Sequence, residues 1–178
     1  SLGFIVVQID GMGTSNRSKK FHDVCWKNLG DAGFPDRILW MRAAAAKHQC
    51  MDLTRVGIHG GSAGGHLAAH VGLVEGTDDP NDDLAVSCKP GALLLFNPVL
   101  DNGPGGWGTG RVGERYPQLS PAHNVSRDDP PAILFLGSED KLIPVATLQS
   151  FTDEMKKAGV RCELHVYAGE GHGFFNFG

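Results

Sequence analysis

The sequence has few cysteines and none in a metal-binding or redox arrangement. Only 4 of its 178 residues are cysteine: Cys25, Cys50, Cys88 and Cys162. No two of them form a CxxC pair, and their spacing does not match that of a metal site. This spacing favours buried free thiols, with a disulfide as the lesser alternative, and it predicts no metal and no redox cofactor.

Strong charge and long apolar runs are also missing. The chain has 16 basic and 20 acidic residues, a formal net charge of −4, and no cluster of Lys and Arg. This balance predicts no nucleic-acid partner. Every apolar run is far too short to span a bilayer, so no membrane partner is expected. No signal peptide is visible, and the chain starts at Ser1 without a Met, so both a cytoplasmic and a secreted bacterial location stay open.

Short apolar segments alternate along the chain with segments of helical periodicity. The pattern predicts helices at 18–29, 35–49, 62–75 and 145–158, and strands at 3–9, 55–59, 91–97, 132–137 and 161–167. Such alternation is typical of a parallel sheet covered by helices on both faces. We therefore expect an α/β fold with three αβα layers and a mainly parallel sheet of about five strands, as a single domain over 1–178.

The motif with the clearest chemistry is Gly-Gly-Ser-Ala-Gly at residues 60–64. It matches GxSxG and lies between an expected strand and an expected helix, as a nucleophile elbow requires. The turn is so tight that Ser62 is expected to have strained dihedral angles. Side chains at Gly60 or Gly64 are expected to clash with neighbouring elements. The pattern predicts that Ser62 is a nucleophile at the positive end of a helix.

A serine nucleophile needs a base, and the base needs an orienting acid. Asp140 follows the strand at 132–137, and His172 follows the last strand between glycines. They therefore come in the order Ser, Asp, His that this kind of site uses. Glu139 and Asp101 are the alternative acids, with Asp101 the stronger. Core or surface packing is the favoured interpretation of the other histidines, which are His22, His48, His59, His66, His70, His123 and His165.

These motifs together resemble the α/β-hydrolase superfamily. Residues 4–65 are similar to the catalytic domain of prolyl oligopeptidases and dipeptidyl peptidases. Residues 91–177, with GSEDKLIP at 137–144 and GEGHGFFN at 169–176, resemble bacterial carboxylesterases near the acetylxylan and feruloyl esterases. The resemblance implies a truncated, minimal α/β-hydrolase fold that lacks the usual N-terminal strands and the C-terminal helix.

The resemblance implies a carboxylic ester hydrolase that uses a Ser-His-Asp triad and an acyl-enzyme, without a cofactor. The peptidases carry a β-propeller for which this length has no room, so we expect small esters with short acyl chains as substrates. The alternatives are a serine peptidase of the prolyl oligopeptidase type and a non-catalytic binding domain. Trp107 and Tyr116 lie in a Gly-rich loop where such esterases build the pocket wall. They either flank the substrate or only pack the loop.

The family's usual oxyanion loop does not precede Ser1. The N–H of Ala63 is the expected first oxyanion donor, and the loop with Gly11, Met12 and Gly13 is the expected source of a second. A strand that normally lies between 3–9 and 55–59 is also missing. An open apolar edge would attract a partner strand, so we expect a homo-oligomer.

Overall fold

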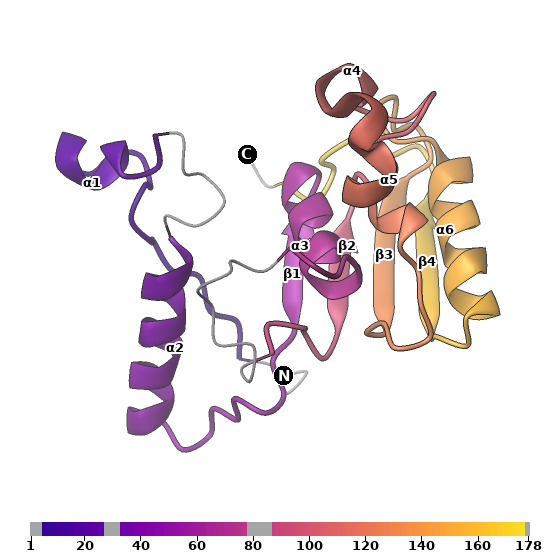
Figure 1. Ribbon diagram of the computed structural model, residues 1–178. Coiled ribbons are helices and arrows are strands. Elements are labelled where there is room, and N and C mark those ends of the chain that lie inside the picture. The colour runs from indigo at the N-terminus through magenta and orange to yellow at the C-terminus, as the bar shows by residue number, and fades with distance from the viewer. Residues whose placement is uncertain (1–4, 27–32, 78–86, 177–178) are drawn as a thin grey trace. The chain divides into compact units, whose positions relative to one another are not determined.

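The computed structural model describes residues 5–26, 33–77 and 87–176. The chain divides into two compact units, residues 1–55 and 56–178, which we call unit 1 and unit 2 (Figure 1). The expectation of a single domain over 1–178 stays a prediction. Among the described residues, no helix combines the length and the apolar character needed to cross a membrane. No disulfide joins the four cysteines, of which only Cys162 is buried.

The described part of unit 1 contains two helices, α1 (Lys19–Asp23) and α2 (Phe34–Lys47). The hydroxyl of Ser18 caps α1 by accepting a hydrogen bond from the N–H of Phe21, at 3.2 Å. The run of four alanines favours helix in α2, which ends before His48. α1 lies inside its predicted range but is much shorter than expected, and α2 begins one residue before its predicted start.

The strand predicted at residues 3–9 is not observed. Residues 5–10 form no strand, and residues 3 and 4 lie outside the described part of the chain. The side chains of Ile5, Val6 and Val7 are exposed. A β-branched sequence only favours a strand, whereas the strand itself also needs a neighbour for its backbone hydrogen bonds.

Unit 2 contains a parallel sheet in the order β1-β2-β3-β4. The strands are β1 (Ile58–Gly61), β2 (Leu93–Phe96), β3 (Ala132–Gly137) and β4 (Cys162–Tyr167). Among the described residues, four of the predicted strands are therefore present, instead of about five. Their register aligns Ile58, Leu93, Ala132 and Cys162 across the sheet. All four strands point the same way, so their carboxyl ends meet at one edge.

The longer helices of unit 2 are α3 (Ala63–Leu73) and α6 (Val145–Lys157). The segment between β2 and β3, which includes the expected Gly-rich loop, contains short helical turns. These are α4 (Thr109–Val112), η1 (Gly113–Arg115), α5 (Tyr116–Leu119) and η2 (Pro121–His123). Its glycines and prolines lower helix propensity, which is why the sequence pattern did not indicate them.

The core of unit 2 lies between the sheet and the helices α3 and α6, whose places beside the sheet are shown in Figure 1. The buried strand residues alternate along the chain, as on one face of a sheet. They pack against buried residues of α3 and α6; the cluster includes Leu93, Leu95, Leu134, Leu136, Ala69, Leu148, Phe151 and Met155. The opposite face is only partly buried and carries Phe96 and Phe135, which stack at 4.8 Å between ring centroids. In the described part of unit 2, α3 and α6 therefore form one helical layer on the sheet.

Candidate active site

Ser62 lies on a strained turn between β1 and α3. Its backbone angles, a φ of 52° and a ψ of −117°, lie in a region that residues other than glycine rarely adopt. Two backbone hydrogen bonds hold the turn: Ser62 N–H donates to the carbonyl of Phe96 at 2.8 Å, and His66 N–H donates to the carbonyl of Ser62 at 3.0 Å. The surrounding structure thus fixes a conformation that places Ser62 at the carboxyl edge of the sheet.

The two outer glycines of the motif differ in their role. A Cβ at Gly60 would overlap the backbone of Gly64, so glycine is required there. At Gly64 a Cβ would meet no atom within 4 Å. The expected clash at Gly64 is therefore wrong, because this position lies in the first turn of α3 with open space beside it.

The structure brings Ser62, His172 and Asp140 together at this edge. The Oγ of Ser62 lies 2.9 Å from Nε2 of His172. On the other side of the ring, Nδ1 of His172 lies 2.8 Å from Oδ2 of Asp140. The Asp140 side chain is fully buried, and that of His172 is 23% exposed. With the proton on Nδ1, the ring donates to Asp140 and accepts from the Ser62 hydroxyl, as a base for that hydroxyl must.

Backbone contacts hold the acid and histidine loops against each other. Oδ1 of Asp140 accepts hydrogen bonds from the N–H groups of Leu142 and Ile143, at 2.8 and 2.9 Å. The N–H of Glu139 donates to the carbonyl of Glu170 at 2.8 Å. A Cβ at Gly137 would overlap the backbone of Glu170, so this glycine lets the two loops approach. Asp140 is thereby oriented before any substrate binds.

The alternative acids and bases are placed differently. Asp101 contacts Nε2 of His123 at 3.1 Å, and Glu139 is exposed. The Nδ1–H of His66 donates to the carbonyl of Val99 at 2.9 Å. Burial lowers the pKa of His66 below its ordinary value of 6.5, against the smaller opposing effect of this hydrogen bond. His66 is therefore a neutral packing residue one helical turn after Ser62.

The proposed oxyanion donors fall in both units. Ala63 begins α3, and the first N–H groups of a helix have no partner within it. In unit 1, the N–H of Met12 donates to Oδ2 of Asp36 at 3.2 Å, and that of Gly13 donates to the carbonyl of Phe21 at 2.8 Å. The N–H groups of Met12 and Gly13 thus already donate hydrogen bonds within unit 1. Gly11 remains the candidate, and its role stays a prediction.

A small, mainly apolar pocket of about 250 Å³ opens beside Ala63. Trp107 is one of its walls, and its contact with a substrate stays a prediction. Tyr116 does not line this pocket and instead packs edge-on against His123, at 5.1 Å between ring centroids. The lining residues come from α3, from the segment after β2 and from α4: Ala63, His66, Leu67, Val99, Asn102, Trp107, Gly108, Arg111 and Val112.

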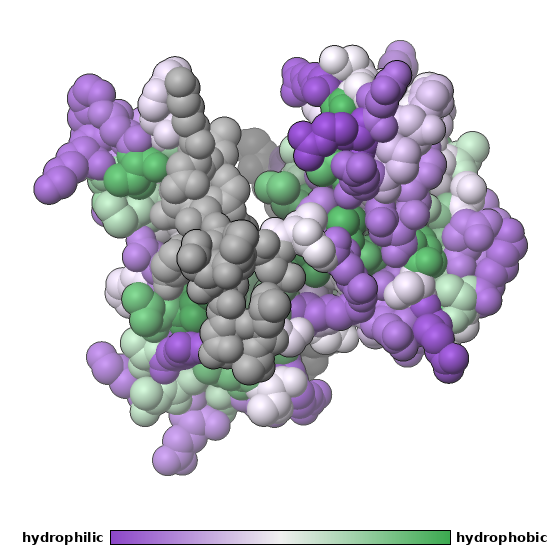
Figure 2. Space-filling model, in the orientation of Figure 1, coloured by the Kyte–Doolittle hydropathy of each residue, from purple (hydrophilic) through white to green (hydrophobic). Residues whose placement is uncertain are grey.

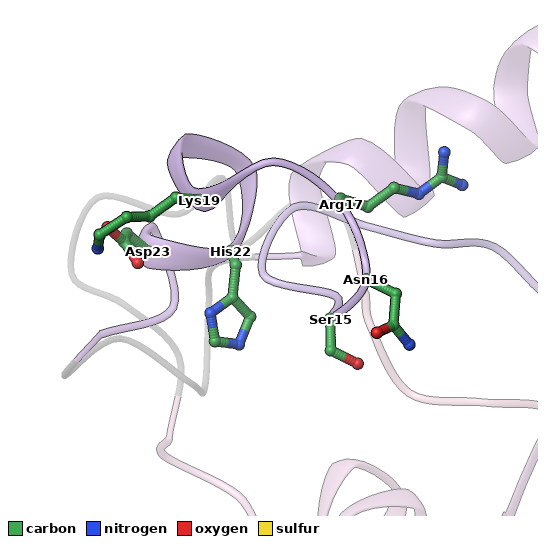
Figure 3. Close-up of a pocket in the computed structure, with 6 residues that line it drawn as sticks. All are labelled: Ser15, Asn16, Arg17, Lys19, His22 and Asp23. Carbon is green, nitrogen blue, oxygen red and sulfur yellow. The ribbon is translucent and has the colours of Figure 1, made fainter.

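Another hollow, of about 530 Å³, lies in unit 1 around α1 (Figure 3). Its lining is polar and exposed. Lys19 pairs with Asp23, and Arg17 extends away from them to pair with Asp10 at 2.9 Å. Although this hollow is the larger of the two, it presents surface charges that already pair with one another. The pocket beside Ala63 is the better candidate for substrate because Ala63, which lines it, directly follows Ser62.

One residue of the site was missed by the sequence analysis. Asn97 follows β2 directly, is 1% exposed, and contacts the His172 ring. The sequence feature that could have indicated Asn97 is a polar residue at the carboxyl end of an apolar strand, followed by a proline. Among the described residues, no cluster of three or more His, Cys, Asp or Glu side chains is arranged to hold a metal ion.

The fold and the site define a serine hydrolase of the α/β-hydrolase type. The family model of the prolyl oligopeptidase family matches residues 1–78 and 96–176, so the chain belongs to that family. It is 33% identical to human dipeptidyl peptidase 8 over 54% of this chain and 10% of that protein. It is 32% identical to an acetylxylan esterase of Xylanibacter ruminicola over 67% of this chain and 26% of that protein.

The solved structures similar to this chain include esterase 2 of Thermogutta terrifontis. The apo form is 40% identical and covers 80% of this chain and 54% of that chain, with a TM-score of 0.69. The butyrate-bound form is 35% identical, covers 83% and 58%, and has a TM-score of 0.67. The chain thus spans about half of this esterase and about a tenth to a quarter of the two sequence relatives. These matches confirm the resemblance to both peptidases and esterases.

Proposed function

We propose that this chain is a carboxylic ester hydrolase for short-chain acyl esters. The observation that carries the proposal is the alignment of Ser62, His172 and Asp140, at 2.9 and 2.8 Å. Such an arrangement suits acyl transfer through a covalent intermediate.

In the first half of the proposed reaction, Ser62 Oγ attacks the ester carbonyl carbon while Nε2 of His172 takes the hydroxyl proton. The N–H of Ala63 and a second donor stabilise the negative oxygen of the tetrahedral intermediate. The bond between the carbonyl carbon and the alkoxy oxygen then breaks, and His172 passes the proton from Ser62 on to the leaving alcohol. Asp140 holds the ring in the required tautomer and stabilises its charged form throughout.

In the second half, water attacks the acyl-enzyme. His172 takes a proton from this water, the bond to Ser62 Oγ breaks, and the proton passes back to Ser62. The products are a carboxylic acid and free enzyme. No further reactant is needed, and His172 serves as base and then acid in both halves.

The pocket beside Ala63 supports the short acyl chain. Its volume of about 250 Å³ lies just below the range of about 300–1,000 Å³ typical of drug-sized ligand sites. Leu67, Val99 and Trp107 give it an apolar wall suited to a few methylene groups. The Thermogutta esterase that resembles this chain was solved with propionate and with butyrate bound.

A panel of p-nitrophenyl esters tests the proposal. We expect acetate to butyrate esters to be hydrolysed with a kcat/KM at least about tenfold above that of octanoate, since each methylene misfit is worth about 1–3 kcal/mol. Dipeptide p-nitroanilides form the comparison set. Equal or better hydrolysis of octanoate would refute the acyl preference, and faster cleavage of the anilides would favour a peptidase. Failure of a fluorophosphonate to label Ser62 would favour a non-catalytic binding domain.

A further inference from the structure

Asn97 sits in the site without a place in the reaction described above. It directly follows β2, and its backbone has a φ of 34°. Among the described residues, the other non-glycine residues with positive φ are Asn16 and Ser62. Asn tolerates this region better than most residues, but the conformation still costs about 1–3 kcal/mol.

The strained backbone of Asn97 is tied to the nucleophile on both sides. The preceding residue, Phe96, accepts a hydrogen bond from Ser62 N–H at 2.8 Å, and Val99 N–H donates to the carbonyl of Ser62 at 3.4 Å. Asn97 N–H itself donates to the carbonyl of Phe135 at 2.7 Å. The turn at Asn97 is therefore fixed relative to Ser62.

The side-chain amide of Asn97 lies against the face of the catalytic histidine ring. Its Nδ2 is 3.4 Å from Nδ1 and 3.3 Å from Nε2 of His172. In the ring plane, an atom so close to both nitrogens would overlap the carbon between them, so the amide must approach from above the plane. The in-plane partners of the two nitrogens are Asp140 and Ser62. The contact is thus an N–H group against an aromatic face.

The amide makes this contact at a local cost. Asn97 Oδ1 is buried and has no hydrogen-bond partner among the described residues. A buried acceptor without a partner costs about 1–3 kcal/mol. A strained backbone and an unpartnered oxygen at one residue are expected where function constrains the residue.

We propose that Asn97 is a positioning residue that holds the His172 ring in the plane shared by Ser62 and Asp140. The two in-plane hydrogen bonds hold the ring by its two nitrogens and do not by themselves oppose a tilt of the ring out of this plane. Contact on the face blocks this tilt. The inference rests on the proposed function for its ester substrates. The activation of Ser62 by His172, however, can be measured without an ester.

Asn97→Gly separates the side chain from the backbone. Glycine adopts positive φ freely, so the turn is kept while the amide and its unpartnered oxygen are removed. We expect kcat for p-nitrophenyl butyrate and the rate of fluorophosphonate labelling of Ser62 each to fall about 10- to 100-fold, with KM changed less than about twofold. Asn16→Gly, at an exposed residue with a φ of 63°, is the matched control and should keep full activity.

Asn97→Asp is nearly isosteric and gives a second readout if the glycine variant unfolds. A carboxylate against the ring stabilises its charged form, in addition to Asp140, which already faces it. The acid limb of the pH profile of kcat/KM should therefore move to higher pH than in the unmodified chain. A residue that only supports the turn would not move it.

The two measurements also separate this proposal from the esterase proposal. Labelling of the unmodified chain without ester hydrolysis would refute the esterase alone, and the Asn97 variants would then be compared by labelling rate. The positioning role would be overturned if folded Asn97→Gly were labelled at the rate of the unmodified chain. It would also be overturned if the acid limb of the kcat/KM profile did not move in Asn97→Asp. Absence of labelling in the unmodified chain would overturn both proposals.

Discussion

The two units of this chain differ in what they do with their apolar residues. In unit 2, Leu95, Leu134 and Phe151 are buried in one cluster between the sheet and its helices. In unit 1, Val6 is 78% exposed, and Leu39 and Trp40 are each 62% exposed. Figure 2 shows such apolar residues in green among hydrophilic ones on unit 1. The difference teaches that an apolar sequence becomes a core only where complementary elements face it.

The largest difference that we expect between the two units is in enzymatic activity, which we assign to unit 2. Ser62→Ala should reduce ester hydrolysis by about 10⁴-fold or more, because the attacking oxygen is removed. The free energy of unfolding should change by no more than about 1.5 kcal/mol, since only the hydroxyl and its hydrogen bond to His172 are lost. Activity assays and urea unfolding check both values. More than a few per cent of residual activity in a clean preparation would show that Ser62 is not the nucleophile.

The three side chains that the sequence indicated would lie together do so in the structure, while their catalytic roles stay a proposal. Ser62, Asp140 and His172 each follow an apolar strand, and parallel strands bring their carboxyl ends to one edge. The geometry of a GxSxG turn then places the serine. These rules need no knowledge of the distant chain, which is why the strands of unit 2 and the three residues could be located without coordinates.

The features that the sequence did not predict depend on contacts made across space. The run at 5–9 looks like a strand but has none of the pairing that would make it one. Tyr116 lies in the expected loop, yet a short helix turns it toward His123 and away from the pocket. Asn97 gains its place only because β2 ends beneath the histidine loop. Neither periodicity nor motif spacing records such contacts.

The next prediction concerns stability and tests the comparison directly. Leu134→Ala should lower the free energy of unfolding by about 2–5 kcal/mol, because this side chain is completely buried at the centre of the sheet. Trp40→Ala, at an exposed position of α2, should change it by no more than about 0.5 kcal/mol. Urea unfolding of both variants gives the two values.

The Trp40 result also bears on the expected oligomer. If Trp40→Ala costs as much as Leu134→Ala, the apolar surface of α2 is covered in solution and the contrast between the units does not hold there. Size-exclusion chromatography with light scattering would then give the mass. A monomer at all concentrations would contradict the homo-oligomer predicted from the sequence.

A smaller effect is expected at the predicted second oxyanion donor. Gly11→Val should lower kcat about tenfold or more with little change in KM, because an oxyanion donor acts mainly in the transition state. The variant also disturbs packing, since a Cβ at Gly11 would lie 2.9 Å from the carbonyl oxygen of Gly33. Gly33→Val is the control, because a Cβ there would lie 3.3 Å from the carbonyl oxygen of Met12 and so disturbs packing between the same two segments. Equal kcat values in the two variants would leave Gly11 with a packing role only.

The smallest expected effect is the pH dependence that His66 gives to unit 2. Burial holds its pKa below the ordinary value of 6.5, so the unfolded chain binds this proton more readily than the folded one. The contribution of His66 to stability is therefore present above pH 6.5 and is lost as the pH falls through its lower folded pKa. The free energy of unfolding should decline over this window with a steeper slope in the unmodified chain than in His66→Gln. Urea unfolding at several pH values between 7.5 and 5 measures both slopes.

The His48→Gln variant, at an exposed position in unit 1, should keep the slope of the unmodified chain. If His66→Gln and His48→Gln give the same slope, the neutral buried state of His66 is wrong, and the acid sensitivity of unit 2 must come from another group.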